Sequence, residues 1–127
     1  MTNKIYKRTL VEDIIKYLES REIIILYGAR QVGKTSILNY LLEHHLTKNT
    51  FYFDLELPRL LELCNQGAES VFNYLLQSGA DEKNKIFLVI DEIQYMDDPT
   101  KFLKIMHDHY PSIKLLVSGS STFEIKK

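Results

Sequence analysis

The chain has 127 residues, of which 45% are hydrophobic and 26% charged, a composition typical of a globular domain in water. Its net charge of −1 provides no basic footprint, so composition does not indicate a nucleic-acid partner. The single cysteine, Cys64, excludes an internal disulfide and a cysteine-based metal site. No apolar run approaches the roughly 18 residues that a membrane span needs. We therefore expect one cytoplasmic domain over residues 1–127 and no membrane segment.

The first predicted elements are a helix and a strand. Thr9 and Glu12 have the spacing of a capping box, which predicts a helix that continues to about Glu19. The apolar face of this helix is expected to consist of Leu10, Ile14, Ile15, Tyr17 and Leu18. The apolar run at residues 23–27 then predicts a short strand.

The most informative stretch follows that strand. Residues 28–35 read G-A-R-Q-V-G-K-T and lead into a helical pattern that extends to about residue 45. A strand, the spacing G-x-x-x-x-G-K-T and a helix together predict a phosphate-binding P-loop. Its glycines let backbone amides approach phosphate oxygens, and the helix N-terminus adds positive potential. The predicted nucleotide-binding residues are Gly28, Ala29, Arg30, Gln31, Val32, Gly33, Lys34, Thr35 and Ser36.

Two of these side chains have specific predicted roles. Lys34 is expected to reach the β- and γ-phosphates, and the Thr35 hydroxyl to be a ligand of Mg²⁺. The sequence therefore predicts a domain that binds a nucleoside triphosphate together with Mg²⁺. No guanine-specific motif of the N-K-x-D type is visible, so we expect the nucleotide to be ATP.

A strand and two helices are predicted next. The aromatic-rich residues 50–55 predict the strand, and Pro58 suits the first turn of a helix. The apolar side of that helix is expected to consist of Leu57, Leu60, Leu61 and Leu63. Residues 69–78 predict the second helix, which Gly79 ends. For Asp54 and Glu56 we favour ordinary loop acids over orientation of Mg²⁺-bound water.

A second motif begins at residue 86. The apolar run I-F-L-V-I predicts a strand buried on both faces of a parallel sheet, and Asp91 and Glu92 follow at its carboxyl end. In open α/β sheets, ligands bind at that edge. Asp91 is expected to hold Mg²⁺ through the water shell of the metal. Glu92 is expected to act as a general base on an attacking water.

The remaining residues predict a helix and a fourth strand. Asp98 is a predicted N-cap and Pro99 opens a helix that extends over residues 100–109. Residues 113–117 predict a strand, and S-G-S-S-T follows at residues 118–122. Because strands alternate with helices along the chain, we expect an α/β fold with three α/β/α layers around a parallel sheet.

The segments GARQVGKT, FDLE, VIDEIQ and LLVSGSS, in this order, resemble a prokaryotic family of AAA+ P-loop ATPases whose longer members carry a C-terminal domain. The resemblance covers essentially the whole chain. It implies that the strands at 86–91 and 113–117 lie between the P-loop strand and the strand at 50–55. It also implies a polar sensor-1 residue at the tip of the strand at 113–117. Ser120 or Ser118 falls at that place, and we favour Ser120 as a third catalytic residue beside Lys34 and Glu92.

The resemblance also implies parts that would lie beyond Lys127: a fifth strand, an arginine finger, a sensor-2 arginine and a helical lid. We therefore expect an ATPase core that lacks those parts, and we place hydrolysis in the intact protein. A homo-oligomer, a C-terminal domain or an unidentified protein partner could supply them.

Two other function classes compete with an ATPase. A nucleotide-binding switch or assembly module would bind ATP without turnover. A P-loop kinase would phosphorylate a small acceptor, although Glu92 directly after Asp91 argues against it. Two interpretations of Gln94 remain open: contact with the γ-phosphate or a relay of its presence, and capping of the loop after the strand. No histidine has a partner at metal-ligand spacing, so we assign no metal beyond nucleotide-bound Mg²⁺.

Overall fold

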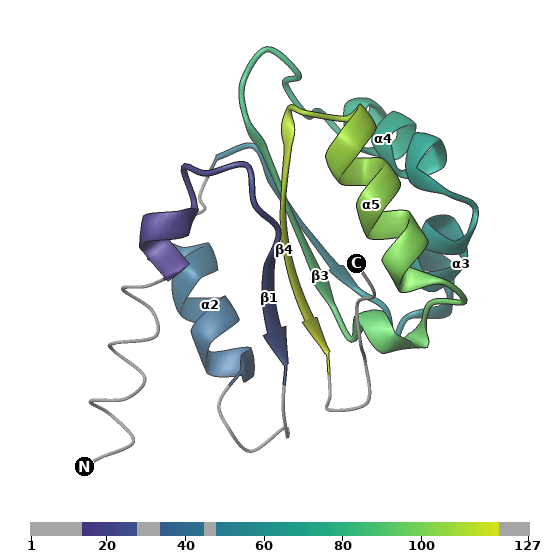
Figure 1. Cartoon of the computed structure of the whole chain (residues 1–127), viewed down its shortest axis with the longest axis horizontal. Helices are drawn as coiled ribbons and strands as arrows, with labels where there is room; N and C mark the ends of the chain where they lie inside the picture. Colours follow the sequence, from purple (N-terminus) through teal and green to yellow (C-terminus); the bar gives the residue numbers. More distant parts are fainter. Residues whose placement is uncertain (1–13, 28–33, 45–47, 120–127) are drawn as a thin grey trace.

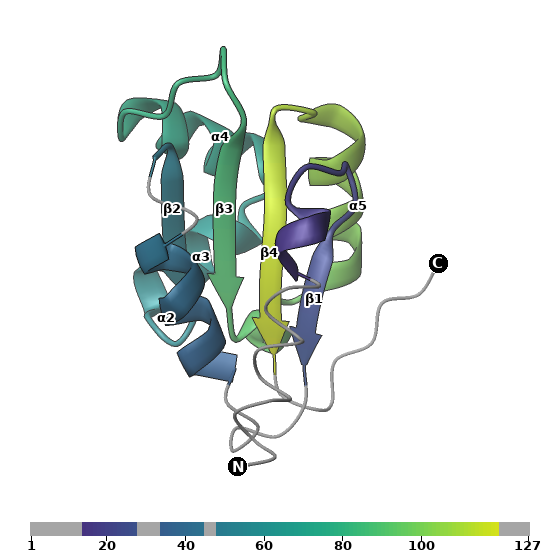
Figure 2. The same cartoon turned by 90° about the vertical axis from the view of Figure 1, so that its left-hand side faces the viewer.

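The computed structural model describes residues 14–27, 34–44 and 48–119. The elements in chain order are β1 (Ile24–Tyr27), α2 (Lys34–His44), β2 (Thr50–Asp54), α3 (Pro58–Asn65), α4 (Ala68–Gln77), β3 (Ile86–Asp91), the 3₁₀ helix η2 (Ile93–Tyr95), α5 (Pro99–His109) and β4 (Ile113–Gly119). The strands form one parallel sheet in the order β1-β4-β3-β2 (Figure 2). This is the α/β architecture expected from the sequence, with β4 and β3 between β1 and β2 as the resemblance implied.

Local sequence signals account for the ends of several elements. Pro58 opens α3 and Pro99 opens α5, both in the first turn, where the absent proline N–H costs no helical hydrogen bond. The Asp98 side chain caps α5 by accepting a hydrogen bond from the backbone N–H of Lys101 at 3.1 Å. The central strands β3 and β4 are almost completely buried, which the apolar run of β3 predicted.

Helices cover both faces of the sheet (Figure 1). On one face α3, α4 and α5 bury a large apolar cluster, in which Leu75, Leu88 and Leu115 are central. On the other face α2 and the helical turn at 14–17 cover a smaller cluster. The smaller cluster consists of Ile14, Leu18, Ile24, Leu26, Leu41, Val89 and Leu116. Asp91 and Ser118 each follow a member of this cluster by two residues, so they belong to the face that α2 covers.

Two expected core positions are exposed instead. Tyr17 has 51% of its surface accessible, whereas Ile14 and Leu18 beside it are buried. A helix turns by about 100° per residue, so residues 14 and 18 lie on one face of it and residue 17 lies to the side of that face. Leu57 is also 51% exposed. It precedes α3 as the N-cap residue with extended backbone, so helical spacing does not set its direction. The prediction that both side chains join the core was therefore wrong.

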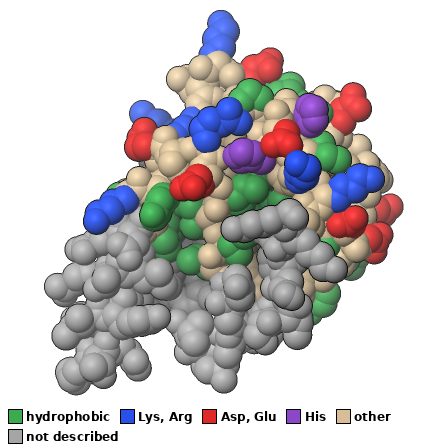
Figure 3. Space-filling model, viewed as in Figure 1, with side chains coloured by type: hydrophobic (Ala, Val, Ile, Leu, Met, Phe, Trp, Pro, Cys, Tyr) green, Lys and Arg blue, Asp and Glu red, His purple; other side chains and the backbone are tan. Residues whose placement is uncertain are grey.

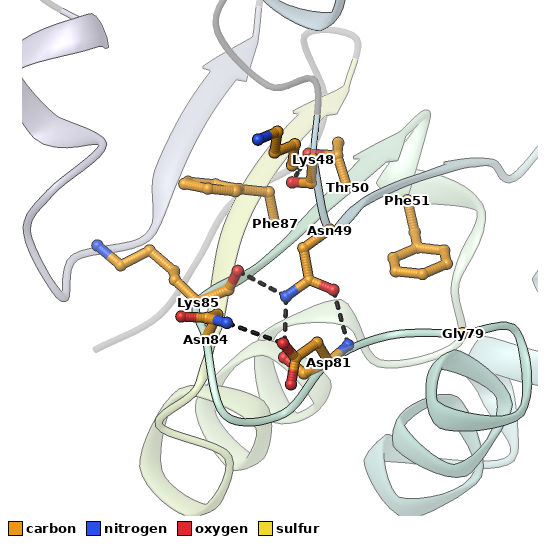
Figure 4. Close-up of a pocket in the computed structure, with 9 residues that line it drawn as sticks. All are labelled: Lys48, Asn49, Thr50, Phe51, Gly79, Asp81, Asn84, Lys85 and Phe87. Carbon is orange, nitrogen blue, oxygen red and sulfur yellow. Dashed lines mark hydrogen bonds between the residues drawn. The ribbon is translucent and has the colours of Figure 1, made fainter.

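Polar side chains close the amino end of the sheet. Asn49, just before β2, has left-handed backbone with φ of 53°. Its amide donates to the carbonyls of Asp81 and Lys85, both at 2.9 Å, and accepts from the Asp81 N–H at 2.8 Å (Figure 4). These residues line a hollow of about 740 Å³, where the Asn84 amide also donates to Asp81 Oδ2 at 2.8 Å (Figure 4). We therefore interpret this end as a structural closure.

Two lysines hold the end of the first helix at the same end of the sheet. Lys114 has only 3% of its surface exposed, and its ammonium donates to the carbonyls of Ser20 and Glu22. Lys85 donates to the Leu18 carbonyl at 3.0 Å. Burial, with a smaller contribution from the charge of Lys85, lowers the pKa of Lys114 to about 8. Lys85 therefore stabilises a carbonyl just after the helix, as the helix dipole favours, and Lys114 stabilises carbonyls of the bend that leads to β1.

The described surface carries charges of both signs. On the face shown in Figure 3, the basic and acidic side chains are interspersed over the described part of the molecule. This distribution agrees with the net charge of −1. Among the described helices, none is long and apolar enough to cross a membrane.

Candidate functional site

The carboxyl ends of the strands lie together at one edge of the sheet. Asp54 at the end of β2 pairs in register with Asp91 at the end of β3. Tyr27 at the end of β1 pairs with Gly119 at the end of β4. Helix α2 begins at this edge and runs back along the sheet (Figure 2). A helix N-terminus and two acidic strand ends therefore meet where a parallel sheet binds its ligands.

The predicted nucleotide-binding residues follow β1 in the sequence and extend into the first turn of α2. Residues 28–33, which include Gly28, Ala29, Arg30, Gln31, Val32 and Gly33, lie outside the described part of the chain. Lys34, Thr35 and Ser36 form the first turn of α2, and their side chains also lie outside the description. The strand and helix that the motif requires are both present, so the context expected for a P-loop is confirmed.

Both carboxylate oxygens of Asp91 accept a hydrogen bond from a hydroxyl group. The Ser118 hydroxyl on β4 donates to Oδ1, and the Tyr52 hydroxyl on β2 donates to Oδ2 at 2.9 Å. Asp91 is 9% exposed and Ser118 is fully buried. The donors come from the strands on either side of β3, so they fix the plane of the carboxylate. A carboxylate accepts about four hydrogen bonds. Asp91 therefore keeps acceptor capacity for a further ligand.

Tyr52 is a residue of this site that sequence reasoning missed. Burial first, then the hydrogen bond to Asp91 and the charges of Asp91, Asp54 and Glu92, raise the pKa of Tyr52 far above its ordinary value. Its hydroxyl therefore stays protonated and donates. Part of the signal was in the sequence: Tyr52 alternates with two phenylalanines, which places it on the opposite face of the strand. The register of β2 against β3 then decides that this face is the one that carries Asp91.

Glu92 is held beside Asp91 in an unusual backbone conformation. Its φ of 60° and ψ of 47° are left-handed, a region that glutamate rarely adopts. The side chain is largely buried, with 9% of the residue exposed. Its Oε1 accepts a hydrogen bond from Gln94 Nε2 at 2.6 Å. The two acidic side chains therefore have different partners. Asp91 accepts hydrogen bonds from hydroxyls on the adjacent strands, and Glu92 accepts one from an amide on the following turn.

Of the other candidate site residues, some lie at this edge of the sheet and others lie outside the described residues. Asp54 Oδ1 accepts the backbone N–H of Glu56 at 3.0 Å, which is the local turn expected of an ordinary loop acid. Ser120, the favoured sensor-1 residue, lies outside the described residues, whereas Ser118 contacts Asp91 directly. Within residues 14–27, 34–44 and 48–119, no cluster of histidine, cysteine, aspartate and glutamate is arranged to hold a metal.

Comparison with known proteins now identifies the fold family. A family model described as an AAA domain matches residues 20–127. The chain belongs to the AAA domain family. This AAA domain is also similar to a chain in the structure of Drosophila ORC bound to DNA, with a TM-score of 0.63 and 14% identity over 95% of this chain and 79% of that chain. At that identity the likeness shows the fold alone, which is that of an AAA+ P-loop ATPase core.

Curated relatives of this AAA domain are much longer than the chain. The uncharacterized protein MJ1637 of Methanocaldococcus jannaschii is 29% identical over 124 residues, which are 93% of this chain and 26% of that protein. The uncharacterized protein MJ1544 of the same organism is 29% identical over 120 residues, 94% of this chain and 26% of that protein. The chain therefore spans about a quarter of these relatives.

The chemistry of the AAA domain edge is that of a nucleotide-binding, ATPase-like site. Mg²⁺ prefers oxygen ligands and keeps several of its waters. Asp91 offers a carboxylate that is fixed by two hydroxyl donors and retains free acceptor capacity, so its donor set fits a water-mediated contact with that ion. Glu92 offers a second carboxylate beside it that can accept a proton.

Proposed function

We propose that this AAA domain binds Mg·ATP and that, in the intact protein, it hydrolyses ATP to ADP and phosphate. The observation that carries the proposal is the placement of Asp91. It ends a buried central strand on the face covered by α2, at the edge where α2 begins. The family match adds that domains of this kind bind nucleotides.

Each residue of the proposed site has one role. The amides of residues 28–33 and the Lys34 ammonium bind the phosphates, and Thr35 and Asp91 hold Mg²⁺, Asp91 through water. When bound, Mg²⁺ neutralises charge on the β- and γ-phosphates. Glu92 accepts a proton from the attacking water while the water oxygen bonds to the γ-phosphorus and the β–γ bridging bond breaks. Ser120 contacts the γ-phosphate or the water as sensor 1.

The proposal also includes an arginine that acts on the transferring phosphate. An arginine that stabilises transferring phosphate contributes strongly to hydrolysis in related chemistry. We propose that a second copy of the chain, a C-terminal domain or another protein supplies this arginine. We also propose that the protein acts in the cytoplasm. The length of the M. jannaschii relatives leaves room for such a domain.

Calorimetry of Mg·ATP binding tests the first half of the proposal. We expect saturable binding by the wild-type chain and loss of binding in Lys34→Ala. Glu69→Gln, on the exposed surface of α4, is the control and should bind like wild type. Equal heats from wild type and Lys34→Ala would reject the proposed P-loop.

Phosphate release by the intact protein, in which we place hydrolysis, tests the second half and separates the rival functions. Glu92→Gln should keep ATP binding and lose turnover by at least about 100-fold. A nucleotide-dependent switch would show ATP binding with no turnover in wild type, so the substitution would change nothing. A kinase would consume ATP faster when a small acceptor is added, which water-driven hydrolysis would not do.

A further inference from the structure

The turn after β3 brings together two motifs that are far apart in sequence. Gln94 belongs to D-E-I-Q, and Gly119 belongs to the S-G-S-S run at the end of β4. The Gln94 amide lies between Glu92 and Gly119: its nitrogen donates to Glu92 Oε1 at 2.6 Å. On its other side, a Cβ added to Gly119 would lie 2.7 Å from Gln94 Oε1. The amide is therefore confined on both sides.

Gly119 is required for space and not for backbone conformation. Among the described glycines, only Gly67 and Gly79 have positive φ. Gly119 continues β4, where any residue could adopt the backbone angles. A contact of 2.7 Å is shorter than a Cβ and an oxygen tolerate, so any side chain at position 119 must displace the Gln94 amide.

The turn itself does not depend on the Gln94 side chain. The Tyr95 N–H donates to the Glu92 carbonyl at 3.2 Å, and the Met96 N–H donates to the Ile93 carbonyl at 3.1 Å. Ile93 is fully buried in the larger apolar cluster and anchors the turn. Backbone bonds and one apolar anchor thus form η2, which weakens the interpretation of Gln94 as a loop cap.

We propose that Gln94 is a positioning residue for Glu92. Its amide fixes the carboxylate of a side chain that leaves the strand with left-handed backbone, and Gly119 provides the space that the amide occupies. The hydrogen bond at 2.6 Å is as short as charge-assisted bonds are, and a primary amide offers no acidic proton to the base. This inference rests on the proposed function, because it assigns Glu92 as the general base.

Turnover and ATP binding measured on one set of variants test the proposal. Gln94→Ala and Gln94→Glu should lower kcat by about 10- to 100-fold with KM and the Kd for Mg·ATP within twofold of wild type. Gly119→Ala should lower kcat similarly. The double variant should be no slower than Gln94→Ala alone, since the added methyl then displaces nothing. Gln77→Ala, an exposed glutamine at the end of α4, should match wild type.

A second measurement needs no turnover. In the nucleotide-free chain, the side-chain ¹⁵N–¹H signals of Gln94 should change on Glu92→Ala, because the substitution removes the acceptor. Unchanged signals would overturn the proposal, as would full kcat in Gln94→Ala or single-variant effects that simply multiply in the double variant. Absence of turnover in the intact wild-type protein, when it binds ATP, would instead reject the proposed hydrolysis, and the role of Gln94 with it.

Discussion

Two residues with left-handed backbone mark opposite ends of the sheet. Asn49 precedes β2 with φ of 53°, and Glu92 follows β3 with φ of 60°. Asparagine adopts this region readily because its short side chain bonds locally, and Asn49 bonds to Asp81 and Lys85. Glutamate has no such preference, and the bond that holds its carboxylate comes from Gln94.

The difference separates a structural residue from a functional one. At Asn49, the conformation and the hydrogen bonds to backbone groups serve the same purpose, which is to join β2 to the segment before β3. At Glu92, the conformation costs roughly 1–2 kcal/mol for a residue other than glycine, and the carboxylate is bonded to the side chain of Gln94 and not to a backbone group. Strain of this kind gathers at functional sites.

Glu92→Gly gives the largest expected effect and tests this contrast directly. Turnover should fall by at least about 100-fold because the proton acceptor is lost. The free energy of unfolding should rise by about 1 kcal/mol because glycine adopts positive φ freely. Urea unfolding and phosphate release on the same preparations measure both. A variant that is clearly less stable than wild type would show that Glu92 has a folding role.

Asn49→Ala should give the opposite result. The substitution removes three side-chain hydrogen bonds and leaves alanine in the left-handed region. We expect the free energy of unfolding to fall by about 2–3 kcal/mol, while the Kd for Mg·ATP stays within twofold. Asn49→Gly is the matched control, since it keeps the backbone conformation and loses only the hydrogen bonds. A loss of ATP affinity in folded Asn49→Ala would contradict the contrast.

Tyr52→Phe should have a smaller effect, confined to the carboxyl end. It removes the donor to Asp91 Oδ2 and keeps the aromatic ring. We expect the Kd for ATP in Mg²⁺ to rise about 5-fold, or roughly 1 kcal/mol, with no change when EDTA removes the metal. An equal change in both conditions would mean that Tyr52 acts on the nucleotide or on the fold.

The last prediction concerns Lys114, at the amino end of the sheet. It should change how steeply the free energy of unfolding depends on pH. Its pKa is about 8 in the folded chain, below the ordinary lysine value of 10.5 that holds in the unfolded chain, so between these values the unfolded chain binds more protons. Stability should therefore rise with pH over that window. Urea unfolding from pH 8 to 10 should show a steeper rise for wild type than for Lys114→Met. Parallel slopes would show that Lys114 does not titrate in that window.

The sequence predicted the sheet well because its signals are local or regular. An uninterrupted apolar run predicted β3, a mostly apolar run predicted β4, and Pro58 and Pro99 predicted helix starts. The strand order came from the family resemblance, since spacing alone does not say which strand enters a sheet between two others. The wrong core positions, Tyr17 and Leu57, lie at a helix edge and a helix cap, where periodicity is least informative.

The site was predicted only in part because its hydrogen bonds cross between strands. Asp91 and Glu92 were visible as acids after an apolar run. The contact of Asp91 with Tyr52 depends on the register of β2 against β3, and the contact of Gln94 with Gly119 depends on β4 lying beside β3. Pairing of this kind is set by the whole sheet, so single motifs do not reveal it.

The lysine contacts at the amino end bear on where this domain begins. The family match starts at residue 20, yet Ile14 and Leu18 are buried in the cluster beneath α2, and Lys85 bonds to the Leu18 carbonyl. A chain cut at residue 20 would expose Val89 and Leu116 to water and leave the Lys85 ammonium without that acceptor. Residues before the start of the family match thus contribute to the core, and we expect a domain expressed from residue 20 to be less stable than the longer chain.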